Sequence, residues 1–207
     1  MTFWDAGELI AAVHSLGIPH PPGTPLFVLV ARATSDALAP LPRAFAVNLL
    51  SAVSTAAACG ILAWLTWRWM RSRAAAFAAA VCAGSMSTVW LNATESEAYA
   101  VSLLLVAAIL FAADRARETG RWPWLVLTAY GIALAVPVHV GALVVVPAAV
   151  VLVARSPDGG IRWSMAGTLA AVGFLVLGVG LASPGMVAAA VGAGAAAIAS
   201  QRRRAIG

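Results

Sequence analysis

The chain has 207 residues, of which 62% are hydrophobic and only 10% charged, with a net charge of +5 and a mean hydropathy of +0.91. Soluble domains carry about 25% charged residues, so this composition excludes a water-soluble globular domain and favours a membrane protein. The apolar runs are continuous rather than alternating, which excludes a membrane β-barrel and predicts an all-α, polytopic transmembrane bundle.

The first 43 residues differ from the rest of the chain. Asp5 and Glu8 are three positions apart, which places both carboxylates on one face of a helix, and their apolar neighbours suit an interfacial helix over residues 5–16. Three prolines in Gly17–Gly23 end that helix and stiffen the chain around His20. A second helix is expected to begin near Pro25, because proline is tolerated in a first turn. We therefore predict an external segment over 1–43 with juxtamembrane helices.

Seven apolar segments follow and predict a bundle of about seven helices over 44–201: 44–67, 74–91, 98–113, 122–138, 139–154, 163–181 and 186–200. Pro137 leaves two interpretations of 122–154 open, either two short spans or one long kinked element with a re-entrant part. Cys59 and Cys82 lie inside apolar runs and are expected to be packing residues without a disulfide.

The arginines predict the orientation of the bundle. Eleven of the thirteen arginines fall in alternate loops, which the positive-inside rule makes cytoplasmic, together with a basic tail over 202–207: Arg68, Arg71, Arg73, Arg115, Arg117, Arg121, Arg155, Arg162, Arg202, Arg203 and Arg204. This placement at span ends argues against a nucleic-acid partner. The non-cytoplasmic face then receives the first 43 residues, the turn at 92–97 and the turn at His139.

Nearly all side chains suited to catalysis gather on that face: Asp5, Glu8, His14, His20, Asp36, Glu95, Glu97 and His139. If the region around 92–99 is helical, Glu95 and Tyr99 share a face and Glu97 points elsewhere. Structural alternatives stay open: a solvated amphipathic helix, an acidic loop, and a His139 bonded to a carbonyl freed by Pro137. No zinc motif, phosphate-binding loop or nucleophile elbow is present, and no metal ligand is assigned, although carboxylates with histidines could hold a divalent metal.

Three stretches together resemble a known family: FWDAGELIAAVHSLGIPHPPGTPLFVLVAR at the start, VNLLSAV at 47–53 and WLNATESEAYAVSLLL at 90–105, followed by the His139 turn. They are similar, over residues 2–155, to the bacterial protein O-mannosyltransferase-like membrane proteins, catalogued as domain of unknown function 2723. The resemblance implies a GT-C glycosyltransferase architecture and a plasma (inner) membrane protein whose active face lies outside the cytoplasm. It implies catalytic roles for Asp5 and Glu8. It implies substrate-binding roles at His20, Glu95, Glu97, Tyr99 and His139, and Arg43 is a further candidate for pairing with phosphate.

The reaction implied is transfer of a sugar, mannose in this family, from a polyprenyl-phosphate donor to a hydroxyl of a protein Ser/Thr or glycan acceptor, with inversion. Family members have a transmembrane helix before the opening motif, so a fragment or reduced relative is expected here. Two other functions stay open, a non-catalytic or truncated membrane scaffold and a lipid or solute transporter. A transporter predicts charged residues along the spans, and the sequence has almost none there.

Overall fold

The computed structural model describes residues 4–21 and 24–206, and within them it confirms the all-α prediction. The elements in chain order are α1 (Trp4–Ser15), α2 (Pro25–Ala37), α3 (Arg43–Met70), α4 (Arg73–Ser85), α5 (Ser87–Thr94), α6 (Ala98–Thr119), α7 (Trp122–Val138), the 3₁₀ helix η1 (Val140–Val145), α8 (Val146–Ala154), α9 (Trp163–Gly180) and α10 (Pro184–Ile206). The second helix begins at Pro25, as predicted.

Three helices among the described residues are long and apolar enough to cross a membrane, namely α3, α6 and α9. α4 and α5 together would make a fourth span, although they meet at a bend of 66°. The apolar helices over 122–138, 140–154 and 184–199 are shorter. The chain is therefore an integral membrane protein.

Two predicted segments are interrupted in the structure. The segment 74–91 is divided at Met86, whose backbone is extended (φ −60°, ψ 131°) and cannot continue the helix. The stretch 122–154 breaks at His139, between the end of α7 and the start of η1. Pro137 lies in the last turn of α7, where it lacks an N–H donor and weakens the helix. Both breaks leave short helices where the sequence alone allowed longer ones.

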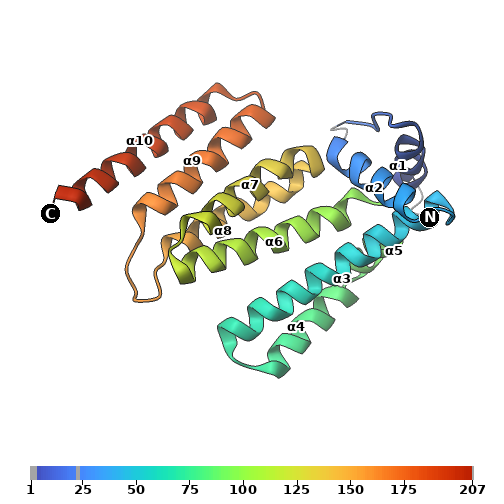
Figure 1. Ribbon diagram of the computed structural model, residues 1–207, viewed down its shortest axis with the longest axis horizontal. Coiled ribbons are helices and arrows are strands. Elements are labelled where there is room, and N and C mark those ends of the chain that lie inside the picture. Colours follow the sequence, from blue (N-terminus) through green and yellow to red (C-terminus); the bar gives the residue numbers. More distant parts are fainter. Residues whose placement is uncertain (1–3, 22–23, 207) are drawn as a thin grey trace. The chain divides into compact units, whose positions relative to one another are not determined.

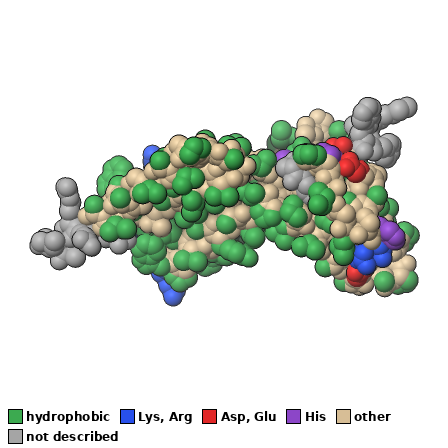
Figure 2. All heavy atoms as spheres, turned by 90° about the horizontal axis from the view of Figure 1, so that it is seen from above, with side chains coloured by type: hydrophobic (Ala, Val, Ile, Leu, Met, Phe, Trp, Pro, Cys, Tyr) green, Lys and Arg blue, Asp and Glu red, His purple; other side chains and the backbone are tan. Residues whose placement is uncertain are grey.

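The chain forms two compact units, each described separately. The amino-terminal unit contains the described residues up to Ala107 together with Pro137–His139, and the carboxy-terminal unit contains the remainder. In the first unit α3 packs beside α4, and in the second α9 packs beside α10 (Figure 1). Much of the surface is apolar: Figure 2 shows hydrophobic side chains over most of the face it displays, as expected where lipid is the solvent.

A small apolar core fixes the start of the amino-terminal unit. Leu9 and Val13 of α1 pack with Phe27 of α2 and Val47 of α3, and the last three of these side chains are fully buried. On α1 the residues at 6, 9, 12 and 13 are buried while those at 7, 8 and 11 are exposed, which is the spacing of an amphipathic helix. This packing holds α1 in a fixed position, so the polar side chains it carries are fixed as well.

Candidate active site

The turn after α1 brings His20 back to the helix it has just left. α1 ends at Ser15, Leu16 adopts a left-handed conformation (φ 53°), and the amide of Gly17 donates to the carbonyl of Ala12 at 2.9 Å. A left-handed residue with this hydrogen bond is a common way to end a helix and reverse the chain. The reversal places His20 against Glu8, twelve residues earlier.

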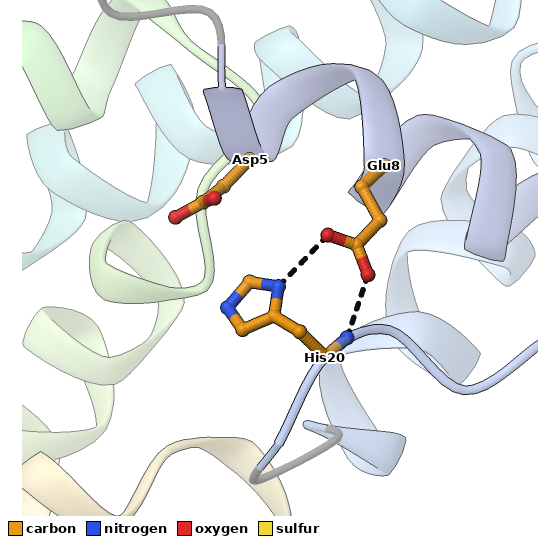
Figure 3. A group of neighbouring side chains, drawn as sticks. All are labelled: Asp5, Glu8 and His20. Atoms are coloured by element: carbon orange, nitrogen blue, oxygen red, sulfur yellow. Dashed lines mark hydrogen bonds and ion pairs between the residues drawn. The ribbon is translucent and has the colours of Figure 1, made fainter.

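Glu8 holds His20 with both carboxylate oxygens (Figure 3). The backbone N–H of His20 donates to Oε1 at 2.6 Å, and Nδ1 lies 2.9 Å from Oε2. The side-chain hydrogen bond to Glu8 raises the pKa of His20, and the same bond lowers the pKa of Glu8. An ion pair is therefore favoured, with Nδ1 turned to Glu8 and Nε2 left for another partner.

A cavity of about 130 Å³ opens beside this pair. Its lining comes from four separate stretches of the chain, and it includes five of the residues expected to form the site: Asp5, His20, Glu97, Tyr99 and His139. Leu9, Pro19, Pro21, Thr24 and Ala98 complete the lining. Glu8 does not line this cavity, so it acts on the cavity through His20.

Glu97 enters the cavity because the turn before α6 is anchored to α3. The Ser96 hydroxyl donates to the side-chain oxygen of Asn48, and the amide of Glu97 donates to the hydroxyl of Ser51 at 3.4 Å. Residues 95–97 lie between helices, so the conditional expectation of a helical face shared by Glu95 and Tyr99 does not apply. Glu97, rather than Glu95, lines the cavity beside Tyr99.

Glu97 is buried, with 9% of its surface exposed. Burial is the main reason that its pKa rises to about 6, and the negative charges of Asp5 and Glu95 add to the effect. A carboxyl group with this pKa exchanges protons near neutral pH, which is useful to a group that receives or donates a proton.

The turn at His139 completes the lining of the cavity. The ring of His139 lies against that of Tyr99, with centroids 4.5 Å apart and planes inclined by 55°. The break between α7 and η1 at this residue therefore has a direct effect on the site, since it turns His139 toward the start of α6.

Arg43 lies in a different cluster, which we call the arginine cluster: His14, Arg32, Asp36 and Arg43. Arg32 donates to Asp36 at 2.8 Å and to the carbonyl of His14 at 2.8 Å, while Arg43 contacts the His14 ring and lies 3.9 Å from Asp36. These contacts join the ends of α1 and α2 to the start of α3. Neither Arg43 nor Glu95 lines the cavity.

Sequence reasoning missed Thr24, Asn48 and Ser51. Thr24 lines the cavity, is 7% exposed and has a left-handed backbone (φ 33°), and its hydroxyl has no hydrogen-bond partner among the described residues. The only signal for Asn48 and Ser51 was their spacing, since two polar residues three positions apart share one face of an otherwise apolar helix.

Asp5, Glu8 and His20 could also hold a divalent cation. Each offers one ligand atom, and these atoms all lie within 4.8 Å of one another (Figure 3). Carboxylate and imidazole ligands suit several divalent metals. In the present arrangement, however, both oxygens of Glu8 already accept hydrogen bonds from His20, so cation binding would require Glu8 to exchange partners.

Fold and cavity together define a helical integral membrane protein with a cavity that contains carboxylates and histidines. Residues 5–158 match the family described as the Protein O-mannosyl-transferase TMEM260 N-terminal domain. The match covers well over half of the chain, so this protein belongs to that family, which confirms the predicted resemblance to O-mannosyltransferase-like proteins.

Curated relatives agree with this assignment. The chain is 33% identical to the mouse Protein O-mannosyl-transferase TMEM260 over 114 residues, which are 55% of this chain and 16% of the relative. It is 25% identical to the Dictyostelium discoideum Protein O-mannosyl-transferase tmem260 over 109 residues, 52% of this chain and 13% of the relative. The matched part thus spans about one sixth or less of each relative's length. No solved structure gives a significant match.

Proposed function

We propose that this chain forms the catalytic region of a membrane glycosyltransferase that moves mannose from a polyprenyl-phosphate donor to a protein Ser or Thr hydroxyl. The proposal includes the GT-C architecture and the bacterial group named above, domain of unknown function 2723. The observation that carries it is the cavity, where Asp5, His20, Glu97, Tyr99 and His139 come together from four stretches of the chain. The curated relatives are named protein O-mannosyl-transferases, which supports the same reaction class.

In the proposed reaction Asp5 takes the proton from the acceptor hydroxyl. The hydroxyl oxygen forms a bond to the anomeric carbon from one side, while the bond between that carbon and the phosphate oxygen breaks on the other side. The bonding electrons leave with the lipid phosphate, and the configuration is inverted. Base assistance of this kind contributes about 10²–10⁴ in rate.

His20 is suited to face the departing phosphate. Glu8 favours its protonated form, and a charge-assisted hydrogen bond from imidazolium to phosphate is stronger than a neutral one. Arg43 is engaged by His14 and Asp36, which favours His20 over Arg43 for this role. Glu97 and Tyr99 then bind hydroxyl groups of the sugar or acceptor, with His139 fixing the Tyr99 ring and Glu95 adding negative charge nearby.

The orientation of the site is part of the proposal. α3 begins at Arg43, close to the turn that carries Glu97, and ends at Met70, so its 28 residues span about 42 Å. Arg68, Arg71 and Arg73 lie at the far end of this helix from Asn48 and Ser51. Because arginine-rich loops favour the cytoplasm, the cavity would open on the non-cytoplasmic face of the plasma membrane.

The test is transfer of mannose from polyprenyl-phosphate mannose to a Ser/Thr peptide by membranes that contain the protein. Asp5→Asn should lower the rate by about 100-fold or more while the protein inserts normally. Asp36→Asn is the matched control, because it removes the same charge from the arginine cluster, and it should keep near-normal transfer. Near-normal transfer by Asp5→Asn would remove Asp5 from its role. Absence of transfer by the unaltered protein with every lipid-linked sugar tried would favour the scaffold or the transporter.

A further inference from the structure

The carboxy-terminal unit contains an open cavity of its own. An open cavity of about 550 Å³ is formed where the end of α6 meets the loop between α8 and α9, drawn in orange in Figure 1. Arg117, Arg155 and Trp163 line it, together with the backbone of Gly159 and Gly160. Nothing in the proposed transfer reaction uses these residues.

The loop that forms this cavity is well held. Arg155 and Ile161 form an antiparallel bridge, the amide of Arg162 donates to the carbonyl of Ala154 at 2.8 Å, and the amide of Ser156 donates to the carbonyl of Gly160 at 2.9 Å. The Arg162 side chain reaches back to the end of α6 and donates to the carbonyls of Ala116 and Arg117. The cavity is therefore a structured surface of this unit.

One positive charge in the cavity is not balanced. Arg117 is paired with the buried Asp114 at 2.9 Å, and the Arg162 side chain donates to two carbonyls at the end of α6. Within the described part of the chain Arg155 is exposed and has no carboxylate partner. Its guanidinium group can thus offer several N–H donors to an anion, and phosphate fits that geometry well.

The cavity continues into an apolar groove. Val151 lines both the cavity and a second open space of about 510 Å³ between η1–α8 and α9, whose walls are almost wholly apolar. Val144 and Phe174, 80% and 40% exposed, lie along this groove. At Gly173 a Cβ atom would lie 2.5 Å from Val146, so α8 and α9 can approach closely at the floor of the groove only because residue 173 is glycine.

We propose that the cavity and groove together bind one anionic phospholipid of the surrounding bilayer. The phosphate-containing headgroup lies against Arg155 and the turn at Ser156–Gly160, and an acyl chain follows Val151 into the groove between α8 and α9. Trp163 lies at the junction, where an aromatic ring with an N–H group suits a membrane interface. Basic pockets between membrane helices bind anionic headgroups in this way. The proposal does not depend on the transfer reaction.

The test measures lipid binding to the whole protein in detergent by native mass spectrometry, with phosphatidylglycerol and phosphatidylcholine of identical acyl chains. We expect about tenfold tighter binding of phosphatidylglycerol. Both headgroups contain an anionic phosphate, but the choline cation of phosphatidylcholine cancels its charge and is repelled by Arg155, whereas phosphatidylglycerol keeps a net negative charge. Arg155→Gln should abolish the preference, and Arg155→Lys should retain part of it. Arg121→Gln is the control, because it removes an exposed arginine at the same end of the unit that does not line the cavity, and it should keep the preference.

A second variant tests the groove. Val151→Trp places a large ring at the junction and should weaken binding of both phospholipids, while leaving inorganic phosphate binding unchanged. Equal binding of the two lipids by the unaltered protein would overturn the proposal. If Arg121→Gln and Arg155→Gln lost the preference for phosphatidylglycerol equally, the proposal would also be overturned, because the lipid would then respond to positive charge in general. Competition by inorganic phosphate at the affinity of the lipid would show that the groove takes no part.

Discussion

Two polar clusters of the amino-terminal unit contain the same kinds of side chain but differ in how their charges are balanced. The arginine cluster joins two arginines, one carboxylate and one histidine, and its ionic contacts are made within the cluster. The cavity contains Asp5, Glu97 and His20 and no arginine among its lining residues. Only in the cavity, therefore, do carboxylates lie without an arginine among the neighbouring lining residues.

This difference separates a structural role from a chemical one. In the arginine cluster each charged group lowers the cost of holding its neighbour, and the contacts connect α1, α2 and α3. In the cavity, burial raises the pKa of Glu97, and repulsion by the nearby Asp5 raises it further. Unfavourable electrostatics of this kind is typical of sites that act on a ligand, because binding can relieve it.

The largest effect is expected from a substitution in the apolar core that supports both clusters. Phe27 is fully buried in the core that joins α1, α2 and α3, so Phe27→Ala should destabilise the unit by about 3–5 kcal/mol. Loss of transfer activity should accompany the loss of stability, because α1 carries both Asp5 and His14. Unfolding of the purified protein in detergent measures the first effect. Phe27→Leu, which keeps most of the volume, should be much milder, and equal results for the two variants would contradict the packing account.

A second change acts on the cavity alone. The pKa of Glu97 is about 6 in the folded protein against 4.5 normally, so the folded state binds more protons than the unfolded state over that range. Stability due to this group therefore falls as pH rises from about 4.5 to above 6. Glu97→Gln should gain up to about 2 kcal/mol above pH 6 and nothing below pH 4.5. Unfolding free energies measured from pH 4 to 8 would show this, and a gain independent of pH would contradict it.

The sequence predicted the helical class, the amino-terminal helix pair and five of the ten cavity-lining residues, because each leaves a local signal. Long apolar segments predict helices, and Pro25 predicts the start of a helix. The positive-inside rule assigned Asp5, Glu97 and His139 to the same face without any knowledge of their distances. The choice between Glu95 and Glu97 could not be predicted. It depends on hydrogen bonds that Ser96 and Glu97 donate to Asn48 and Ser51, which lie nearly fifty residues earlier in the chain.

The ion pairs could not be predicted from the sequence either, because their partners lie far apart in the chain. Arg43 was a candidate for phosphate because it is one of two arginines near the external face, and nothing local indicated that His14 and Asp36 would engage it. The pairing of Glu8 with His20 requires the chain reversal at Leu16, where the backbone is left-handed. Glycine usually marks such a position, and the leucine here gives no sign of the turn. Such contacts follow from tertiary packing, which a single sequence does not display.

A smaller effect is expected in the arginine cluster. Asp36 is half exposed, and exposed ion pairs contribute about 0.2–1 kcal/mol. Asp36→Asn should therefore lower the unfolding free energy by less than about 1 kcal/mol, and by less still at high salt, because screening already weakens the contact. A loss of several kcal/mol would show that Asp36 supports more than its two arginines.

The smallest effect on stability is expected for the pair formed by Glu8 and His20 at the edge of the cavity. Glu8→Gln removes the negative charge that favours the protonated His20, so the pKa of His20 should fall toward its ordinary value. The His20 ring signals followed by NMR during a pH titration would report this. The pair stabilises the fold only while Glu8 is ionised and His20 protonated, so its contribution is lost as pH rises through the pKa of His20. If the pKa of His20 were unchanged in Glu8→Gln, the proposed effect of Glu8 on His20 would be contradicted.

Photolabelling tests the central claim most directly. A polyprenyl-phosphate mannose analogue with a photoreactive group on the sugar is bound to the protein in its membrane, irradiated, and the labelled residues are identified by peptide mass spectrometry. If the cavity is the site of sugar transfer, the label will be found around Asp5, at Glu97–Tyr99 or at His139, and excess unlabelled donor will remove it. Specific labelling confined to the carboxy-terminal unit would contradict this account.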